Sequence, residues 1–92
     1  MAMKIAFDPA KREMTLHWRG LDFADAGKVF AGRQATIKDV RRDYGEPRFI
    51  TAGFLNGRMV VLVWTPREQG PRIISMRHAH GKEEDRWRKH LG

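Results

Sequence analysis

The sequence predicts an α+β fold, in which two helices and a C-terminal helix pack on a three- to four-stranded antiparallel meander preceded by a short N-terminal strand. Two observations carry this prediction. Aspartates that can cap helices stand at two places in the first third of the chain, and Asn56-Gly57, the strongest short hairpin signal, separates two apolar stretches in the second half. With 92 residues, we expect a single small domain over 1–92 with a modest core.

The N-terminal segment predicts a short strand at Lys4–Phe7 and then a helix. Asp8 provides a capping carboxylate, and Pro9 stands at the first helical position, where its missing N–H costs nothing. We expect the helix to run to Arg19, because Gly20 can adopt the left-handed conformation that ends many helices.

A second helix is expected to open at Asp22 and to end at Gly32. Asp25 in its first turn interacts favourably with the helix dipole. Apolar residues recur at helical spacing and predict one buried face, made of Phe23, Ala26, Gly27 and Phe30.

From residue 35 onward the pattern changes to that of strands, and the chain closes with a segment that is polar nearly all round. The expected segments are a weak strand at Ala35–Val40, a charged loop at Arg41–Pro47, strands at Arg48–Leu55, Arg58–Thr65 and Arg72–His78, and a helix at Gly81–Leu91.

The two-residue turn at Asn56-Gly57 fixes which residues of its flanking strands face each other. Counting outward from the turn places Arg48 opposite Thr65 and, beyond the paired residues, Glu46 opposite Arg67. These side chains therefore gather on one face at the open end of the hairpin. Both faces of the hairpin are apolar, so helices or a partner must cover both.

The face on which Arg72 and Arg77 lie depends on the turn that follows. A four-residue loop places Arg77 behind Leu62, whereas a five-residue loop turns it to the face of Val63 and Arg67. Pro71 is compatible with both loops, so the two alternatives stay open.

Composition limits the partner and the compartment. Eighteen Lys and Arg against eleven Asp and Glu give a net charge of +7, which favours a polyanion such as nucleic acid or an acidic protein. The chain has no cysteine, no apolar run long enough to span a membrane and no signal-peptide layout, so a cytoplasmic protein is expected. The four histidines lack metal-ligand spacing, and we expect neither a metal nor another cofactor.

Arginine and glutamate on a sheet suit RNA cleavage by attack of the substrate's own 2′-hydroxyl. This reaction needs a proton acceptor, for which Glu46 or a histidine is a candidate, and fixed positive charge on the phosphorane, which guanidinium groups supply. Trp64 and Trp87 are candidates for stacking on an unpaired base, although Trp64 lies mid-strand among valines and is better interpreted as core.

Several segments resemble the BrnT toxin family over nearly the whole chain. They are Asp8-Pro9-Ala10-Lys11, Gly20-x-x-Phe23, Glu46-x-Arg48-Phe49-Ile50-x-x-Gly53, Gly57-Arg58, Val63-Trp64-Thr65-Pro66-Arg67, and Arg72-Ile73-Ile74-Ser75-Met76-Arg77-x-Ala79. Glu46 to Ala79 is the most specific part.

The resemblance implies a RelE-like fold, RNA cleavage that inhibits translation, and a BrnA-type antitoxin in a two-to-two complex that binds DNA through the antitoxin. It marks Arg67 and Arg77, which would hold the scissile phosphate, and these two with Glu46 are the catalytic candidates. The candidates for binding RNA are Arg48, Arg72, Lys11 and Trp87.

The chain departs from the family at the end of the first helix. The family usually carries Asn and then Lys-His-Gly, where this chain has Thr15 and Trp18-Arg19-Gly20. A histidine used in chemistry would be lost here, whereas one that only ties down the helix end can be replaced by Arg19. A non-enzymatic nucleic-acid-binding or protein-interaction module remains the alternative function.

Overall fold

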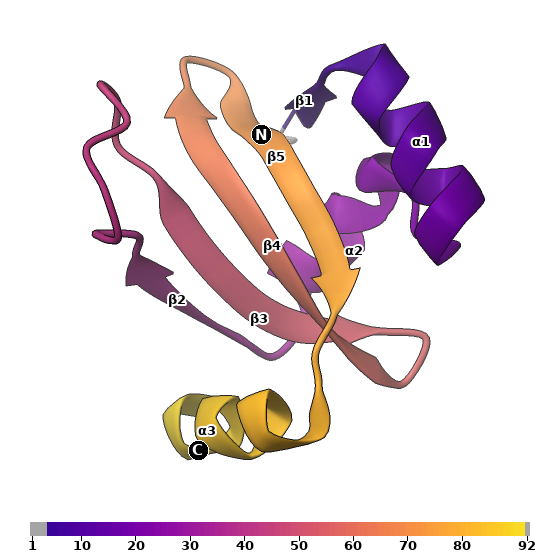
Figure 1. The fold of residues 1–92 in the computed structure, drawn as a ribbon, viewed down its shortest axis with the longest axis vertical. Helices are drawn as coiled ribbons and strands as arrows, with labels where there is room; N and C mark the ends of the chain where they lie inside the picture. The colour runs from indigo at the N-terminus through magenta and orange to yellow at the C-terminus, as the bar shows by residue number, and fades with distance from the viewer. Residues whose placement is uncertain (1–3, 92) are drawn as a thin grey trace.

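The computed structural model describes residues 4–91, which form three helices, one short 3-10 helix and five strands (Figure 1). In chain order these are β1 (Ala6–Phe7), α1 (Pro9–Arg19), the 3-10 helix η1 (Phe23–Asp25), α2 (Ala26–Ala31), β2 (Gln34–Lys38), β3 (Phe49–Leu55), β4 (Arg58–Arg67), β5 (Gly70–His78) and α3 (Gly81–Leu91).

The strands form one mixed sheet in the order β1-β5-β4-β3-β2. The predicted α+β class is confirmed, and the meander of β2 to β5 is antiparallel throughout. The N-terminal strand belongs to the same sheet, because β1 pairs in parallel with β5 through Arg72 and Ile73. Within residues 4–91 no helix is long and apolar enough to cross a membrane.

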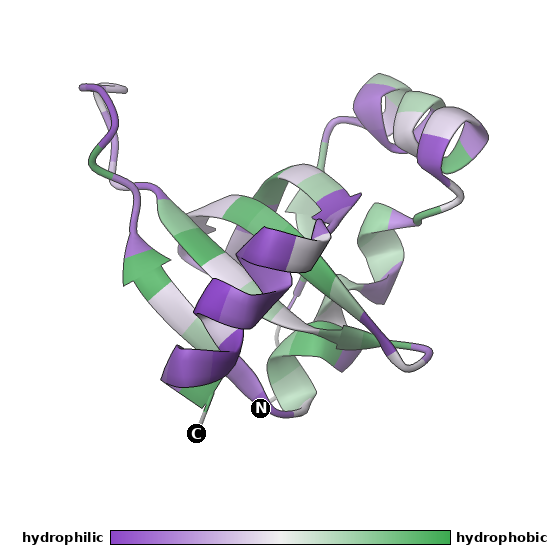
Figure 2. Ribbon diagram, turned by 60° about the horizontal axis from the view of Figure 1, so that its bottom comes forward, coloured by the Kyte–Doolittle hydropathy of each residue, from purple (hydrophilic) through white to green (hydrophobic). Residues whose placement is uncertain are grey.

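Helices cover both faces of the sheet, as its two apolar faces require (Figure 2). On one face, η1 and α2 bury Phe23, Ala26 and Val29 against Leu62 and Ile73. Of the expected helical face, Phe23 and Ala26 are buried, whereas Gly27 and Phe30 are only half-buried. The 3-10 turn at the start of the segment explains the difference, because it rotates the later residues and brings Val29 inward.

The other face is covered by α3, whose underside carries very few apolar residues. Trp87 packs there on Ala52, Met59 and Val61, and Leu91 lies beside them. The outer surface of α3 is almost entirely polar, as its hydrophilic colour in Figure 2 shows.

The hairpin of β3 and β4 has the predicted register. Phe49 pairs with Trp64, Ile50 with Val63 and Leu55 with Arg58. The turn residue Asn56 has a φ of 52° and Gly57 a φ of 79°, the left-handed values that the two-residue turn requires.

A tight turn followed by a β-bulge decides on which face of the sheet Arg77 lies. Neither of the two expected loop lengths included this combination. Arg67 pairs with Gly70, so only two residues make the turn. The pairing then shifts by one residue, and Ile74 stands opposite no residue of β4. As a result Arg77 lies opposite Val61, on the same face as Val63 and Arg67.

Helix α1 has the predicted bounds and caps, yet none of its side chains is buried. Asp8 accepts a hydrogen bond from Ala10 N at 2.9 Å, and Gly20 ends the helix with a φ of 68°. The helix is anchored at its two ends, by Arg12 and by Arg19. It otherwise stands off the sheet, as Figure 2 shows.

The first anchor of α1 is a bidentate ion pair. Arg12 Nε and Nη2 donate to the two carboxylate oxygens of Asp22 at 2.7 and 2.9 Å. Asp22 also caps η1 by accepting from Ala24 N at 2.9 Å. These donors, the Arg12 guanidinium first among them, lower the pKa of Asp22 to about 2.

Replacing Asp22 by alanine should lower the free energy of unfolding at neutral pH by about 1–2 kcal/mol, the usual cost of a lost cap with some ion-pair loss. Because the pKa of Asp22 is lowered on folding, this contribution is present above pH 4 and is lost as pH falls toward 2. Urea titrations of both proteins across that range measure it. Asp22→Asn keeps an acceptor for Ala24 but not the charge, and it should lie between them at pH 7. A difference independent of pH would contradict the assignment.

Candidate functional site

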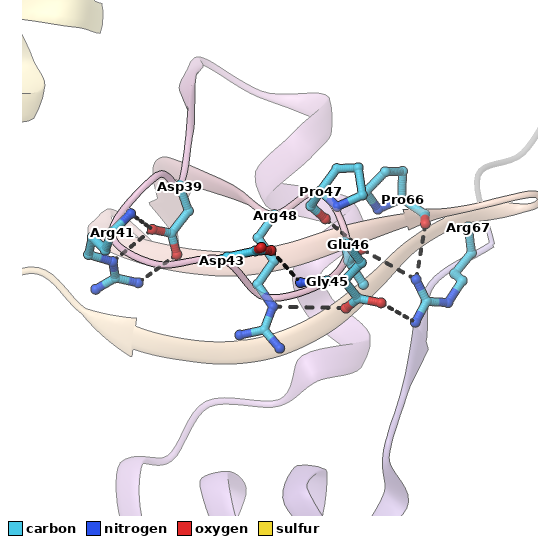
Figure 3. Close-up of polar contacts among 10 residues, drawn as sticks. Asp39, Arg41, Asp43, Gly45, Glu46, Pro47, Arg48, Pro66 and Arg67 are labelled. Carbon is cyan, nitrogen blue, oxygen red and sulfur yellow. Dashed lines mark hydrogen bonds and ion pairs between the residues drawn. The ribbon is translucent and has the colours of Figure 1, made fainter.

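Charged side chains meet at the open end of the β3–β4 hairpin, as the register predicted. Glu46 Oε1 accepts from Arg67 Nη2 at 3.3 Å, and Glu46 Oε2 lies 3.9 Å from Arg48 Nε (Figure 3). Glu46 is therefore placed between two guanidinium groups, that of Arg48 directly before β3 and that of Arg67 at the end of β4. We call Glu46, Arg48 and Arg67 the hairpin-end cluster.

The Arg67 guanidinium is held in place by the chain around it. Its Nη1 donates to Thr65 Oγ1 at 3.3 Å and to the Pro66 carbonyl oxygen at 3.2 Å. Thr65 is itself buried and donates to the Pro47 carbonyl oxygen at 2.7 Å, which ties β4 to the segment before β3. The Arg67 side chain is still 46% exposed, so the fixed charge remains open to a ligand.

Arg48 lies against an aromatic ring that the sequence analysis did not single out. Its guanidinium carbon is 4.0 Å from the centroid of Tyr44, a cation–π contact. Arg48 Nε is buried without a hydrogen-bond partner among residues 4–91, since the 3.9 Å to Glu46 is too long. The available signal was the chain's single tyrosine in the middle of a charged loop.

The loop between β2 and β3 is ordered by a buried carboxylate. Asp39 accepts two bonds of 2.8 Å from the Arg41 guanidinium and one of 3.2 Å from Arg41 N. These bonds hold the pKa of Asp39 well below its usual range. Asp39 N in turn donates to the Arg48 carbonyl oxygen at 2.8 Å. The loop encloses an open hollow of about 560 Å³ next to the cluster, with Tyr44, Glu46 and Arg48 in its wall.

Arg72 belongs near this cluster, and Arg77 does not. Arg72 lies opposite Thr65 in the register, diagonally across from Arg67, and is half-buried. Arg77 lies opposite Val61, six residues along β4 from Arg67. At about 3.3 Å per residue this separates the two by roughly 20 Å along the strand.

The structure therefore does not bring Arg67 and Arg77 together, as one shared scissile phosphate would require. Arg77 instead forms a bidentate pair with Glu83 of α3, with two bonds of 2.6 Å. The pair raises the pKa of Arg77 and lowers that of Glu83, and a hydrogen bond between the two side chains is the main cause in both cases. Arg77 fastens α3 to the sheet in this structure.

Two of the expected RNA-binding residues lie elsewhere. Trp87 is only 8% exposed and packs under α3, so the expectation that it stacks on a base is wrong. The reason is that α3 has almost no other apolar side chain with which to bind the sheet. Lys11 is exposed on α1, in the wall of a hollow that also contains Trp18 and Ser75.

Trp64 is half-buried and packs against the core, in line with its position among valines. Its ring packs edge-on against Phe30 and is stacked on Phe49, with centroid distances of 5.4 and 5.0 Å. Trp64 Nε1 donates to Thr51 Oγ1 at 2.8 Å.

The departure from the family at the end of α1 has a structural counterpart. Arg19 Nη1 donates to the Met76 carbonyl oxygen at 3.0 Å and ties the helix end to β5. Arg19 thus performs the anchoring role expected for it at this position. Among residues 4–91, no three His, Asp or Glu side chains lie together as metal ligands would.

One comparison with known proteins matches the part of the chain that contains these residues. The model of a family described as ribonuclease toxin, BrnT, of type II toxin–antitoxin systems matches residues 7–83. This range includes the hairpin-end cluster as well as Arg72, Arg77 and Glu83. A search of curated proteins gives no match.

Proposed function

Since the chain belongs to the BrnT family of ribonuclease toxins of type II toxin–antitoxin systems, we propose that it cleaves RNA at the hairpin-end cluster. The main observation in support is the contact of Glu46 with Arg67 at 3.3 Å, with Arg48 on its other side. A proton acceptor there stands beside fixed positive charge on a partly exposed surface, the combination that cleavage by the RNA's own 2′-hydroxyl requires.

In the proposed reaction the RNA supplies the nucleophile. Its 2′-hydroxyl oxygen attacks the adjacent phosphorus and the bond to the 5′ oxygen breaks, which leaves a 2′,3′-cyclic phosphate and a 5′-hydroxyl. Glu46 accepts the proton of the 2′-hydroxyl, and the leaving 5′ oxygen takes a proton from solvent.

The charge that develops on the phosphorane is stabilised by Arg67, whose guanidinium is held by Thr65 and Pro66 before the substrate arrives. The Arg48 guanidinium, which lies against the Tyr44 ring and is partly exposed, adds a second positive charge for a phosphate oxygen. Arg72 extends the positive surface along the RNA backbone, where it binds phosphate without touching the scissile bond.

RNA cleavage by the purified protein should persist unchanged in excess EDTA, because neither the nucleophile nor the charge stabilisation comes from a metal ion. The assay follows cleavage of a labelled single-stranded RNA and identifies the new 3′ ends. Cyclic phosphate ends are expected. Loss of cleavage in EDTA, restored by a divalent cation, would contradict the mechanism.

The proposed biological role is that of a translation inhibitor acting on RNA in the cytoplasm. The proposed partner is a BrnA-type antitoxin, in a two-to-two complex that binds DNA only through the antitoxin. The high positive charge of the chain supports both an RNA substrate and an acidic protein partner. Binding of such a partner to the folded state alone would raise the melting temperature of the toxin.

A further inference from the structure

A groove runs between α1 and the outer edge of β5, away from the hairpin-end cluster. It consists of two hollows of about 390 and 400 Å³ that share Trp18 and Arg19 in their walls. Within residues 4–91, α1 is fastened near its two ends, by Arg12 on Asp22 and by Arg19 on Met76. The helix face that lines the groove remains largely uncovered.

One wall of the groove is an open strand edge. The two-residue strand β1 pairs only with Arg72 and Ile73. From Ile74 to His78, the outer side of β5 has no neighbouring strand within the described part of the chain. The Met76 carbonyl oxygen points outward there, because it accepts the bond from Arg19. Such an edge is a template on which another strand can pair.

The opposite wall is an apolar helix face. Met14 is 58% exposed and Trp18 76% exposed, and both line the groove together with Ile74. Methionine, tryptophan and arginine are the residue types enriched where proteins bind each other, and large exposed apolar side chains in one groove are uncommon on a protein that acts alone.

The charge of the groove has one sign. Lys11 and Arg19 lie along it, Arg77 at its end is paired with Glu83, and no Asp or Glu is among the described residues that line either hollow. An occupant with acidic side chains is therefore favoured.

We propose that this groove is the docking site of the antitoxin, which adds an extended, acidic and apolar segment as a strand along β5 under α1. The proposal rests on the proposed function, because membership of a toxin–antitoxin family is what supplies the partner. A peptide strand uses both walls, since its backbone pairs with the edge from Ile74 to His78 and its alternate side chains face Met14 and Trp18. RNA would use the positive charge but not the strand edge.

The first test measures affinity. The probe is the small protein encoded beside the gene for this chain, titrated calorimetrically into the free toxin. Trp18→Ala and Met14→Glu should each weaken binding tenfold or more. Leu16→Ala is the matched control, because Leu16 is 46% exposed on the same helix but lines neither hollow, and it should change affinity less than twofold. Cleavage of RNA by the free variants, measured in parallel, should equal that of the wild type.

The second test locates the segment by hydrogen exchange of the complex. Amides in residues 74–78 should exchange more slowly than in the free toxin, whereas those of β2, the other edge of the sheet, should not change. Protection confined to β2, or unchanged affinity of both groove variants, would overturn the proposal. So would a Trp18→Ala protein that binds single-stranded RNA more weakly but the antitoxin normally. If the antitoxin binds the groove and the wild type does not cut RNA, the docking site stands and the proposed function fails.

Discussion

Replacing Arg67 by alanine should lower the rate of RNA cleavage a hundredfold or more while the protein still folds. The Arg67 guanidinium is fixed by Glu46, Thr65 and Pro66, so it can stabilise a phosphorane without rearrangement. Loss of one such preorganised donor typically costs about 3–4 kcal/mol of transition-state stabilisation. Single-turnover cleavage rates and thermal melting of the same samples measure the two effects separately.

Two variants sharpen this experiment. Arg58→Ala removes an exposed arginine at the other end of β4 and should leave the rate unchanged. Arg67→Lys should restore only part of the activity, because an ammonium group does not reproduce the two-pronged contact with phosphate. If the pair with Glu46 is only a surface salt bridge, Arg67→Ala will cost at most about 1 kcal/mol of stability and cut RNA at the full rate.

Replacing Gly53 by alanine should destabilise the protein by about 2–3 kcal/mol, the range of an overpacked core site. Gly53 is buried in β3, and a Cβ atom there would lie 2.6 Å from Val29 Cγ1 and 3.4 Å from the Arg33 carbonyl oxygen. Val29 is fully buried, so it has no space to move into. Urea-induced unfolding, followed by the near-ultraviolet signal of the core tryptophans, measures the loss.

The double variant with Val29→Ala provides the control. Removing the valine methyl groups makes room for the new Cβ, so the combined loss should be smaller than the sum of the single losses by 1 kcal/mol or more, in the usual range for residues in contact. Additive losses would show that the cost of Gly53→Ala arises elsewhere in β3.

The parts of the fold that local chemistry decides could be predicted from the sequence. Asp8, Pro9 and Gly20 are sufficient to define α1, and Asn56-Gly57 fixes the register as far as Glu46 and Arg67. That register alone places Glu46, Arg48 and Arg67 on one face at the open end of the hairpin. This placement depends only on counting residues from a turn whose geometry permits one alignment.

The remaining features depend on contacts that are distant in the sequence. No local pattern marks β1 as a parallel partner of β5 or Arg77 as the partner of Glu83. Trp87 looked available for stacking because its helix is polar, yet that same scarcity of apolar residues makes it the residue that the sheet buries. A polar helix with one tryptophan is better read as a helix attached through that tryptophan.

The bulge at Ile74 decides which face of the sheet each later residue of β5 points to. In an uninterrupted ladder Arg72 and Arg77, five positions apart, would face opposite sides of the sheet, so Arg77 would point into the core beneath η1 and α2 and Met76 would point toward α3. The unpaired Ile74 shifts the alternation of side chains by one residue. As a result Met76 stays buried and Arg77 reaches Glu83. Deleting Ile74 would leave every cross-strand pair intact, because Ile73 and Ser75 already stand opposite the neighbouring residues Trp64 and Val63.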